Sequence, residues 1–163
     1  MAIRIDDDGT ISIYQGDSGE ITINGLFEPI YATKQVIVGY KETGELDDDG
    51  NPITIPIYET VTTDEITNPK NFKVYLSVYD KKRNYVMQKA PVVNNGKPSV
   101  KIPILATETD LWEVPTNKAS ETYYYGIKAC EQGTQNEDTL FIGGKDYGEL
   151  NVIIVYPKQV EGE

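Results

Sequence analysis

The chain has 163 residues, with 15 Lys and Arg against 26 Asp and Glu, which gives a formal net charge of −11. It has no histidine and one cysteine, Cys130, so Ser-His-Asp and Cys-His catalysis, His-ligated zinc and an internal disulfide are excluded. The acid excess argues against nucleic acid as a partner, and no apolar run is long enough for a signal peptide or a membrane span. We therefore expect a soluble chain that starts at its natural N-terminus and uses no metal or cofactor.

Most of the chain alternates between apolar and polar residues, which is the pattern of half-buried β-strands. Polar turns rich in Gly, Asn and Asp separate the runs at residues 16–19, 80–84, 94–97 and 143–145. Short strands at this spacing predict an all-β sandwich. In chain order, the predicted strands are residues 10–14, 20–24, 72–79, 99–104, 122–130, 138–142 and 150–156.

Residues 106–114 are the segment with a helical pattern, and one helix of this length does not make a helical layer. Thr107 is the expected N-cap, and Pro115 is expected to end the helix.

Residues 27–69 interrupt the sandwich pattern with four prolines and two weaker strand patterns, at residues 35–40 and 53–58. We predict a single β-sandwich domain over residues 1–163, with residues 27–69 as an inserted extension. The extension is expected to form its own hairpin, in which residues 35–41 pair with residues 53–59.

Charge is unevenly distributed along the chain. Residues 1–68 hold 3 basic and 14 acidic side chains, whereas residues 69–101 hold 8 basic and one acidic. Such segregation either fixes the register between neighbouring copies or reflects solvated turns that differ in sign, and the sequence leaves both interpretations open.

Two acidic runs, Asp6–Gly9 and Asp47–Gly50, are the candidates for a cation site. An EF-hand loop needs alternating ligands and a Glu at its twelfth position, and these runs place Asp17 and Tyr58 there. We therefore interpret both as turns closed by glycine. Two carboxylates alone could serve a glycosidase, but nothing in the sequence singles out a pair.

Tyr123, Tyr124 and Tyr125 follow one another in a predicted strand, so at least one face of that strand is expected to lie in the core. Tyr75, Tyr79 and Tyr85 would extend an aromatic surface of the kind common in protein interfaces. Cys130 is interpreted as a small buried apolar residue.

The order of these segments follows a recognisable pattern at residues 10–26 and 72–157. Its parts are a Gly-Asp-x-Gly hairpin, a polar turn after a core strand, an acid-bearing helix, a tyrosine-rich strand and a Glu-Asp-Thr strand. They appear here as Gln15-Gly16-Asp17-Ser18-Gly19, Val78-Tyr79-Asp80, Thr107-Glu108-Thr109-Asp110-Leu111, Thr122-Tyr123-Tyr124-Tyr125 and Glu137-Asp138-Thr139-Leu140. The pattern resembles the N-terminal domain of baseplate upper proteins from phages of Gram-positive bacteria. The resemblance implies an immunoglobulin-like antiparallel β-sandwich.

The extension at residues 27–69 has no counterpart in that pattern, and no coiled coil follows the last predicted strand before Glu163. We therefore expect a non-enzymatic virion protein, assembled in the bacterial cytoplasm, that serves as a capsid decoration subunit or as a baseplate or tail adaptor. Its expected partners are further copies of itself and other virion proteins, with no nucleic acid and no membrane. The alternative is a carbohydrate-binding or adhesin module that recognises host-surface glycans through exposed tyrosines. The predicted contact residues are Tyr75, Lys81, Lys82, Arg83 and Tyr85.

Overall fold

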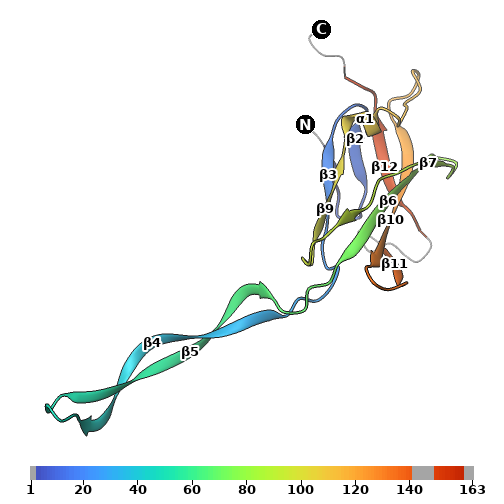
Figure 1. Cartoon of the computed structure of the whole chain (residues 1–163). Coiled ribbons are helices and arrows are strands. Elements are labelled where there is room, and N and C mark those ends of the chain that lie inside the picture. The colour runs from blue at the N-terminus through green and yellow to red at the C-terminus, as the bar shows by residue number, and fades with distance from the viewer. Residues whose placement is uncertain (1–2, 141–148, 160–163) are drawn as a thin grey trace. The chain divides into compact units, whose positions relative to one another are not determined.

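A computed structural model describes residues 3–140 and 149–159, and the chain divides into two compact units (Figure 1). Residues 1–27 and 70–163 form one unit, here called the sandwich, and residues 28–69 form the other, here called the hairpin. No helix in the described ranges is long and apolar enough to span a membrane. The elements are β1 (Arg4–Ile5), β2 (Ile11–Tyr14), β3 (Gly19–Ile23), β4 (Tyr31–Leu46), β5 (Pro52–Ile66), β6 (Phe72–Tyr79), β7 (Tyr85–Gln88), β8 (Val92–Val93), β9 (Val100–Ile104), α1 (Ala106–Thr109), β10 (Glu121–Glu131), β11 (Glu137–Leu140) and β12 (Asn151–Tyr156).

The sandwich unit contains two sheets. The larger has eight strands in the order β1-β2-β12-β10-β6-β7, with β11 also paired to β10 and β8 also paired to β6. The smaller consists of β3 and β9. The pairings are antiparallel except for β2 and β12, which run parallel with Ile11 opposite Ile153. The predicted all-β, sandwich-like fold is confirmed. The parallel pair of β2 and β12 departs from the expected antiparallel arrangement.

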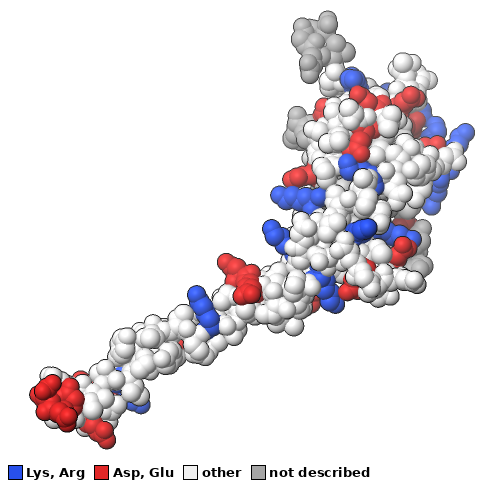
Figure 2. All heavy atoms as spheres, in the orientation of Figure 1, with Lys and Arg blue, Asp and Glu red and all other residues white. Residues whose placement is uncertain are grey.

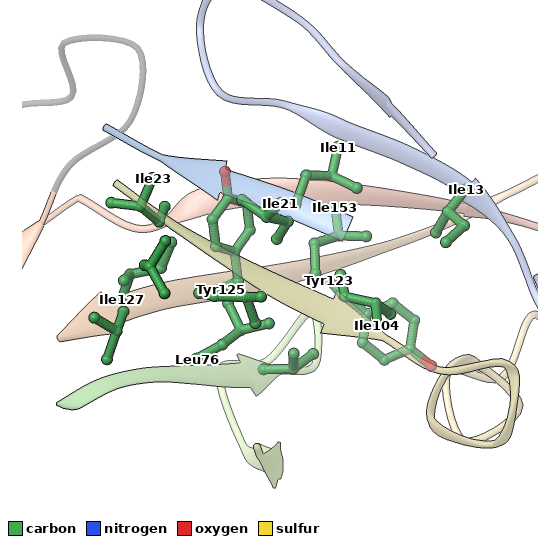
Figure 3. Packing of buried hydrophobic residues seen from close by; sticks show 14 of the residues in the cluster. Ile11, Ile13, Ile21, Ile23, Leu76, Ile104, Tyr123, Tyr125, Ile127 and Ile153 are labelled. Atoms are coloured by element: carbon green, nitrogen blue, oxygen red, sulfur yellow. The ribbon is translucent and has the colours of Figure 1, made fainter. Parts of the chain in front are cut away.

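The core lies between the two sheets and follows from the alternation in the sequence (Figure 3). In β6 the residues Phe72, Val74, Leu76 and Val78 are buried, while the residues between them face away from the core. The same alternation in β10 buries Tyr123 and Tyr125 and leaves Tyr124 on the outer face, which confirms that one face of this strand lies in the core. Further core residues come from the remaining strands and from the segment after α1: Ile11, Ile13, Ile21, Ile23, Val100, Ile102, Ile104, Trp112, Ile127, Ala129, Ile153 and Val155.

Cys130 is half-buried rather than buried, which corrects the prediction. It follows Ala129, a core residue, so the alternation of β10 turns its side chain to the outer face, opposite Lys73 in the register.

The helix is shorter than predicted and begins at a different cap. It covers Ala106–Thr109 with Leu105 at the N-cap position, whereas residues 106–114 and a Thr107 cap were expected. Glu108 decides the start, because its carboxylate accepts the backbone N–H of Leu105 at 2.7 Å and is itself held by Lys89 at 2.6 Å. The chain continues as a tighter turn, in which the backbone N–H of Trp112 donates to the carbonyl of Thr109 at 3.0 Å. This turn brings the Trp112 side chain into the core.

Strand boundaries differ from the prediction mostly by one or two residues, but β7 and β8 were not predicted. Both are short segments paired to β6, and neither shows the period-two pattern over enough residues to stand out. β1, a strand of two residues at Arg4–Ile5, pairs with β2. Residues 141–142 of the expected strand 138–142 and the expected turn at residues 143–145 lie outside the described residues.

The hairpin unit consists of β4 and β5, antiparallel over almost their whole length. The predicted pairing of the two segments is confirmed: Val36 lies opposite Glu59 and Lys41 lies opposite Ile55, although the strands are longer than the sequence pattern indicated. Asn68 closes the base, since its Oδ1 accepts the Ile30 N–H at 2.7 Å and its Nδ2 donates to the Glu28 carbonyl at 2.9 Å.

Candidate functional site

The turn between β6 and β7 carries three of the predicted contact residues, Lys81, Lys82 and Arg83, and we call it the cationic turn. The carboxylate of Asp80 fixes it by accepting the backbone N–H of Asn84 at 2.8 Å and that of Lys82 at 2.9 Å. These hydrogen bonds hold the pKa of Asp80 below its usual value, and the bond from the Asn84 N–H has the larger effect. Three cationic side chains are therefore presented on a turn of defined geometry.

Arg83 is the residue of this turn with a left-handed backbone, at φ 64°. Its guanidinium carbon lies 5.1 Å from the centroid of the Tyr124 ring, within the range of a cation–π contact. The contact joins the turn to β10, the central tyrosine-rich strand. Tyr124 was not among the predicted contact residues.

Tyr85 lies opposite Tyr79 in the register of β7 and β6, and Tyr79 lies opposite Tyr124 in that of β6 and β10. These three rings form a row across the sheet, here called the tyrosine row, next to the cationic turn. Tyr85 is the most exposed member, at 65%. Tyr75 lies on the same face of β6, but four residues, or about 13 Å, from Tyr79. The structure thus brings four of the five predicted residues together and leaves Tyr75 apart.

A shallow hollow lies beside the cationic turn, with Lys81, Glu113, Glu121 and Tyr123 in its lining. The carboxylate of Glu121 lies 3.3 Å from Lys118 Nζ and 3.8 Å from Lys81 Nζ. Burial alone would raise the pKa of Glu121, but the Thr122 N–H and the two lysines lower it below its usual value. The carboxylate therefore stays charged and positions Lys81.

The hairpin presents a second surface, whose residues are not among the predicted contact residues. No residue of 28–69 is buried. Among the described residues, fifteen large hydrophobic side chains are exposed, and ten of them belong to the hairpin. They are Ile30, Tyr31, Ile37, Val38, Tyr40, Leu46, Ile53, Ile55, Ile57 and Tyr58.

Both faces of the hairpin are apolar in its middle part. The register places Ile37 opposite Tyr58, whereas Ile57 pairs with Gly39 after an irregularity in β4 and so points to the other face. The signal in the sequence was the departure of β4 and β5 from strict alternation of apolar and polar residues, which is the pattern of a strand covered on both sides.

The end of the hairpin is acidic, as Figure 2 shows. We call this end the acidic tip, and its side chains are Glu42, Glu45, Asp47, Asp48 and Asp49. Asp47 Oδ1 accepts the backbone N–H of Asn51 at 2.8 Å and that of Asp49 at 2.9 Å, so the interpretation of Asp47–Gly50 as a turn is confirmed. Within residues 3–140 and 149–159, no three His, Cys, Asp or Glu side chains are arranged to hold a metal ion.

Comparison of the chain with protein-family models, with curated proteins and with solved structures gives no match.

Proposed function

We propose that this protein is a non-enzymatic structural component of a bacteriophage virion, in which the hairpin is the arm that docks on a neighbouring subunit. The observation that carries the proposal is the hairpin itself, with ten exposed large hydrophobic side chains and no buried residue. An isolated two-stranded ribbon is marginally stable in water. A ribbon of this length with two apolar faces is therefore suited to being covered by a partner.

The energetics favour docking. Fully burying one Ile or Tyr side chain contributes roughly 1.5–3 kcal/mol, so covering ten half-exposed ones contributes on the order of 10 kcal/mol. Association costs about 4–15 kcal/mol in lost translational and rotational freedom. The apolar gain is thus of the size needed to offset that cost, and polar contacts decide which partner is chosen.

The place in a virion comes from the sequence resemblance, and it allows a capsid decoration subunit or a baseplate or tail adaptor. The experiment is incorporation into particles of the phage that encodes the chain, followed by mass spectrometry of the purified particles. In one variant residues 34–61 are replaced by Asn-Gly, which joins Thr33 to Thr62, its partner in the register, through a two-residue turn. In a second, Ile37, Tyr40, Ile55 and Ile57 are changed to Thr, which keeps the strand propensity but removes the apolar surface.

We expect the wild-type chain in the particles and both variants to be absent or strongly depleted. The four-threonine variant separates the apolar surface from the mere length of the arm. Purified particles without the wild-type chain would overturn the proposed location. Particles that incorporate both variants like the wild type would overturn the docking role of the hairpin.

A second candidate is a glycan-binding module, which the tyrosine row and the charged side chains in the adjacent hollow favour. Sugars stack on aromatic rings with polar groups nearby, and Tyr124 lies in the row beside Arg83. Binding to a glycan array that is lost with Tyr124→Ala supports this candidate. An array without binding by the wild-type chain favours the structural role.

A further inference from the structure

We propose that the acidic tip of the hairpin in one copy docks on the cationic turn and the tyrosine row of a second copy of this chain. The inference rests on the proposed function, because it names the partner of the docking arm.

The acidic tip and the cationic turn have the same backbone design. In the tip, Asp47 accepts the N–H groups of residues 49 and 51 through its side chain and that of Gly50, at 3.0 Å, through its carbonyl. In the turn, Asp80 accepts those of residues 82 and 84 through its side chain and that of Arg83, at 2.8 Å, through its carbonyl. The fourth residue has a left-handed backbone in both cases, at φ 81° for Gly50 and 64° for Arg83.

The two turns differ in the charge of the side chains that this design presents. The positions after the anchoring Asp hold Asp48 and Asp49 in the tip, and Lys81 and Lys82 in the turn. The hairpin as a whole, residues 28–69, holds two basic and nine acidic side chains. One chain therefore carries two surfaces of opposite sign, which is what a head-to-tail contact between identical copies needs.

The apolar parts of the two surfaces also match. Behind the acidic tip the hairpin exposes Leu46, at 65%, and Ile53, at 37%. Beside the cationic turn the sandwich exposes the ring of Tyr85, and Tyr79 and Tyr124 continue the tyrosine row across the sheet. Tyrosine and arginine are enriched in the centres of protein interfaces, where charged pairs at the rim fix the orientation.

The net charge of −11 does not prevent the contact. At physiological ionic strength charges are screened beyond about 8–10 Å, so two copies respond mainly to the charges that meet at the interface. At that interface the five acids of the tip face the three cations of the turn.

The experiment exchanges the charges between the two turns, which is sterically mild because their backbones are alike. One variant is Asp48→Lys with Asp49→Lys, and the other is Lys81→Asp with Lys82→Asp. The anchoring Asp47 and Asp80 are left in place. Sedimentation of the full-length chain measures self-association, and thermal unfolding verifies that each variant is folded.

We expect each variant alone to raise the dissociation constant of self-association by roughly tenfold or more, because like charges now meet. A mixture of the two variants in equal amounts restores association, since the hairpin tip of each variant then meets the turn of the other variant, which has the opposite charge. Asp7→Lys is the control for the tip, as it lies in the similar Asp6–Gly9 turn, whose Gly9 N–H donates to the Asp6 carbonyl at 2.9 Å. Lys101→Glu, on β9 of the other sheet, is the control for the turn. Both controls are expected to associate like the wild type.

A wild-type chain that stays monomeric up to millimolar concentration would overturn the inference, as would variants that associate unchanged or a mixture that fails to restore association. These results leave the proposed function standing if the hairpin is still needed for incorporation into particles, in which case its partner is a different protein. The result that would overturn the proposed function is different: it is the absence of the wild-type chain from the particles.

Discussion

Arg83 lies over the ring of Tyr124, with its guanidinium carbon 5.1 Å from the ring centroid, although its own backbone is left-handed at φ 64°. A side chain with a Cβ costs about 1–2 kcal/mol in that conformation. At the matching position of the acidic tip the chain uses Gly50, which adopts a left-handed backbone without this cost. The contact with Tyr124 offsets part of the cost at Arg83 and keeps a cation beside the tyrosine row.

Two substitutions at Arg83 separate the backbone from the side chain. Arg83→Ala keeps the strained backbone and loses the cation–π contact, so we expect the free energy of unfolding to fall by about 0.5–1 kcal/mol. Arg83→Gly loses the same contact but relieves the backbone, so we expect it to be more stable than the alanine variant by about 1 kcal/mol. Urea denaturation measures both. Equal stability of the two variants would contradict the strain at this position.

Asn94 is expected to be the most important polar side chain of the sandwich. It is 3% exposed, its Oδ1 accepts the Phe72 N–H at 2.7 Å, and its Nδ2 donates to the carbonyls of Lys70 and Lys97 at 2.8 and 2.6 Å. Asn94→Ala leaves these groups without their partner away from water, so we expect a loss of about 2–4 kcal/mol in the free energy of unfolding.

Asn68 is the matched control for Asn94, because it clamps the base of the hairpin in the same way but is only half-buried. Water can replace its bonds in Asn68→Ala, so we expect a loss below about 1 kcal/mol. Similar losses for the two alanine variants would show that burial does not set the cost.

Alkaline pH is expected to destabilise the sandwich through its buried tyrosines. Burial, with a smaller effect of the Glu121, Glu113 and Asp80 charges, raises the pKa of Tyr123 to about 12, and burial also raises the pKa of Tyr125. The unfolded chain loses these protons near pH 10, so stability is constant with respect to them below that pH and falls between about pH 10 and 12. For Tyr123 the loss is on the order of 2 kcal/mol.

Urea denaturation across this pH range measures the effect, and Tyr123→Phe removes the contribution of that phenol. The variant is expected to lose less stability than the wild type between pH 10 and 12. An unchanged slope in the variant would contradict the assignment to Tyr123.

Removal of the hairpin is expected to leave the sandwich folded. Since no residue of 28–69 is buried, the variant with residues 34–61 replaced by Asn-Gly should change the free energy of unfolding of the sandwich by less than about 1 kcal/mol. Leu76→Ala, which empties a core position, should cost about 2–5 kcal/mol under the same conditions. Calorimetry compares the two, and a hairpin deletion as costly as the core variant would show that the sandwich depends on the hairpin.

The sequence predicted the parts of the fold that depend on local alternation. Phe72–Tyr79 is a strand with the expected bounds, and one face of the tyrosine-rich strand, that of Tyr123 and Tyr125, lies in the core as expected. The helix was misjudged because its start depends on Glu108, which Lys89 holds from a distant part of the chain. Contacts of that kind have no local signature.

The candidate site was predicted only in part, because some of its contacts also join distant parts of the chain. Lys81, Lys82 and Arg83 are adjacent in the sequence, so one turn was enough to group them. Placing Tyr124 beside Arg83 required the pairing of β6 with β10, which the sequence does not specify. The apolar faces of the hairpin appeared in the sequence only as weak strand patterns, because Val36, Ile37 and Val38 follow one another without alternation and a proline stands between Ile55 and Ile57.

The most direct measurement of the central claim, that the hairpin is a docking arm, is an electron cryomicroscopy reconstruction of the particle that contains this chain. We predict that the apolar middle of the hairpin, around Ile37, Tyr40 and Ile57, is covered by a neighbouring subunit and that the acidic tip lies against the cationic turn of another copy. A reconstruction in which the hairpin is surrounded by solvent would contradict the account.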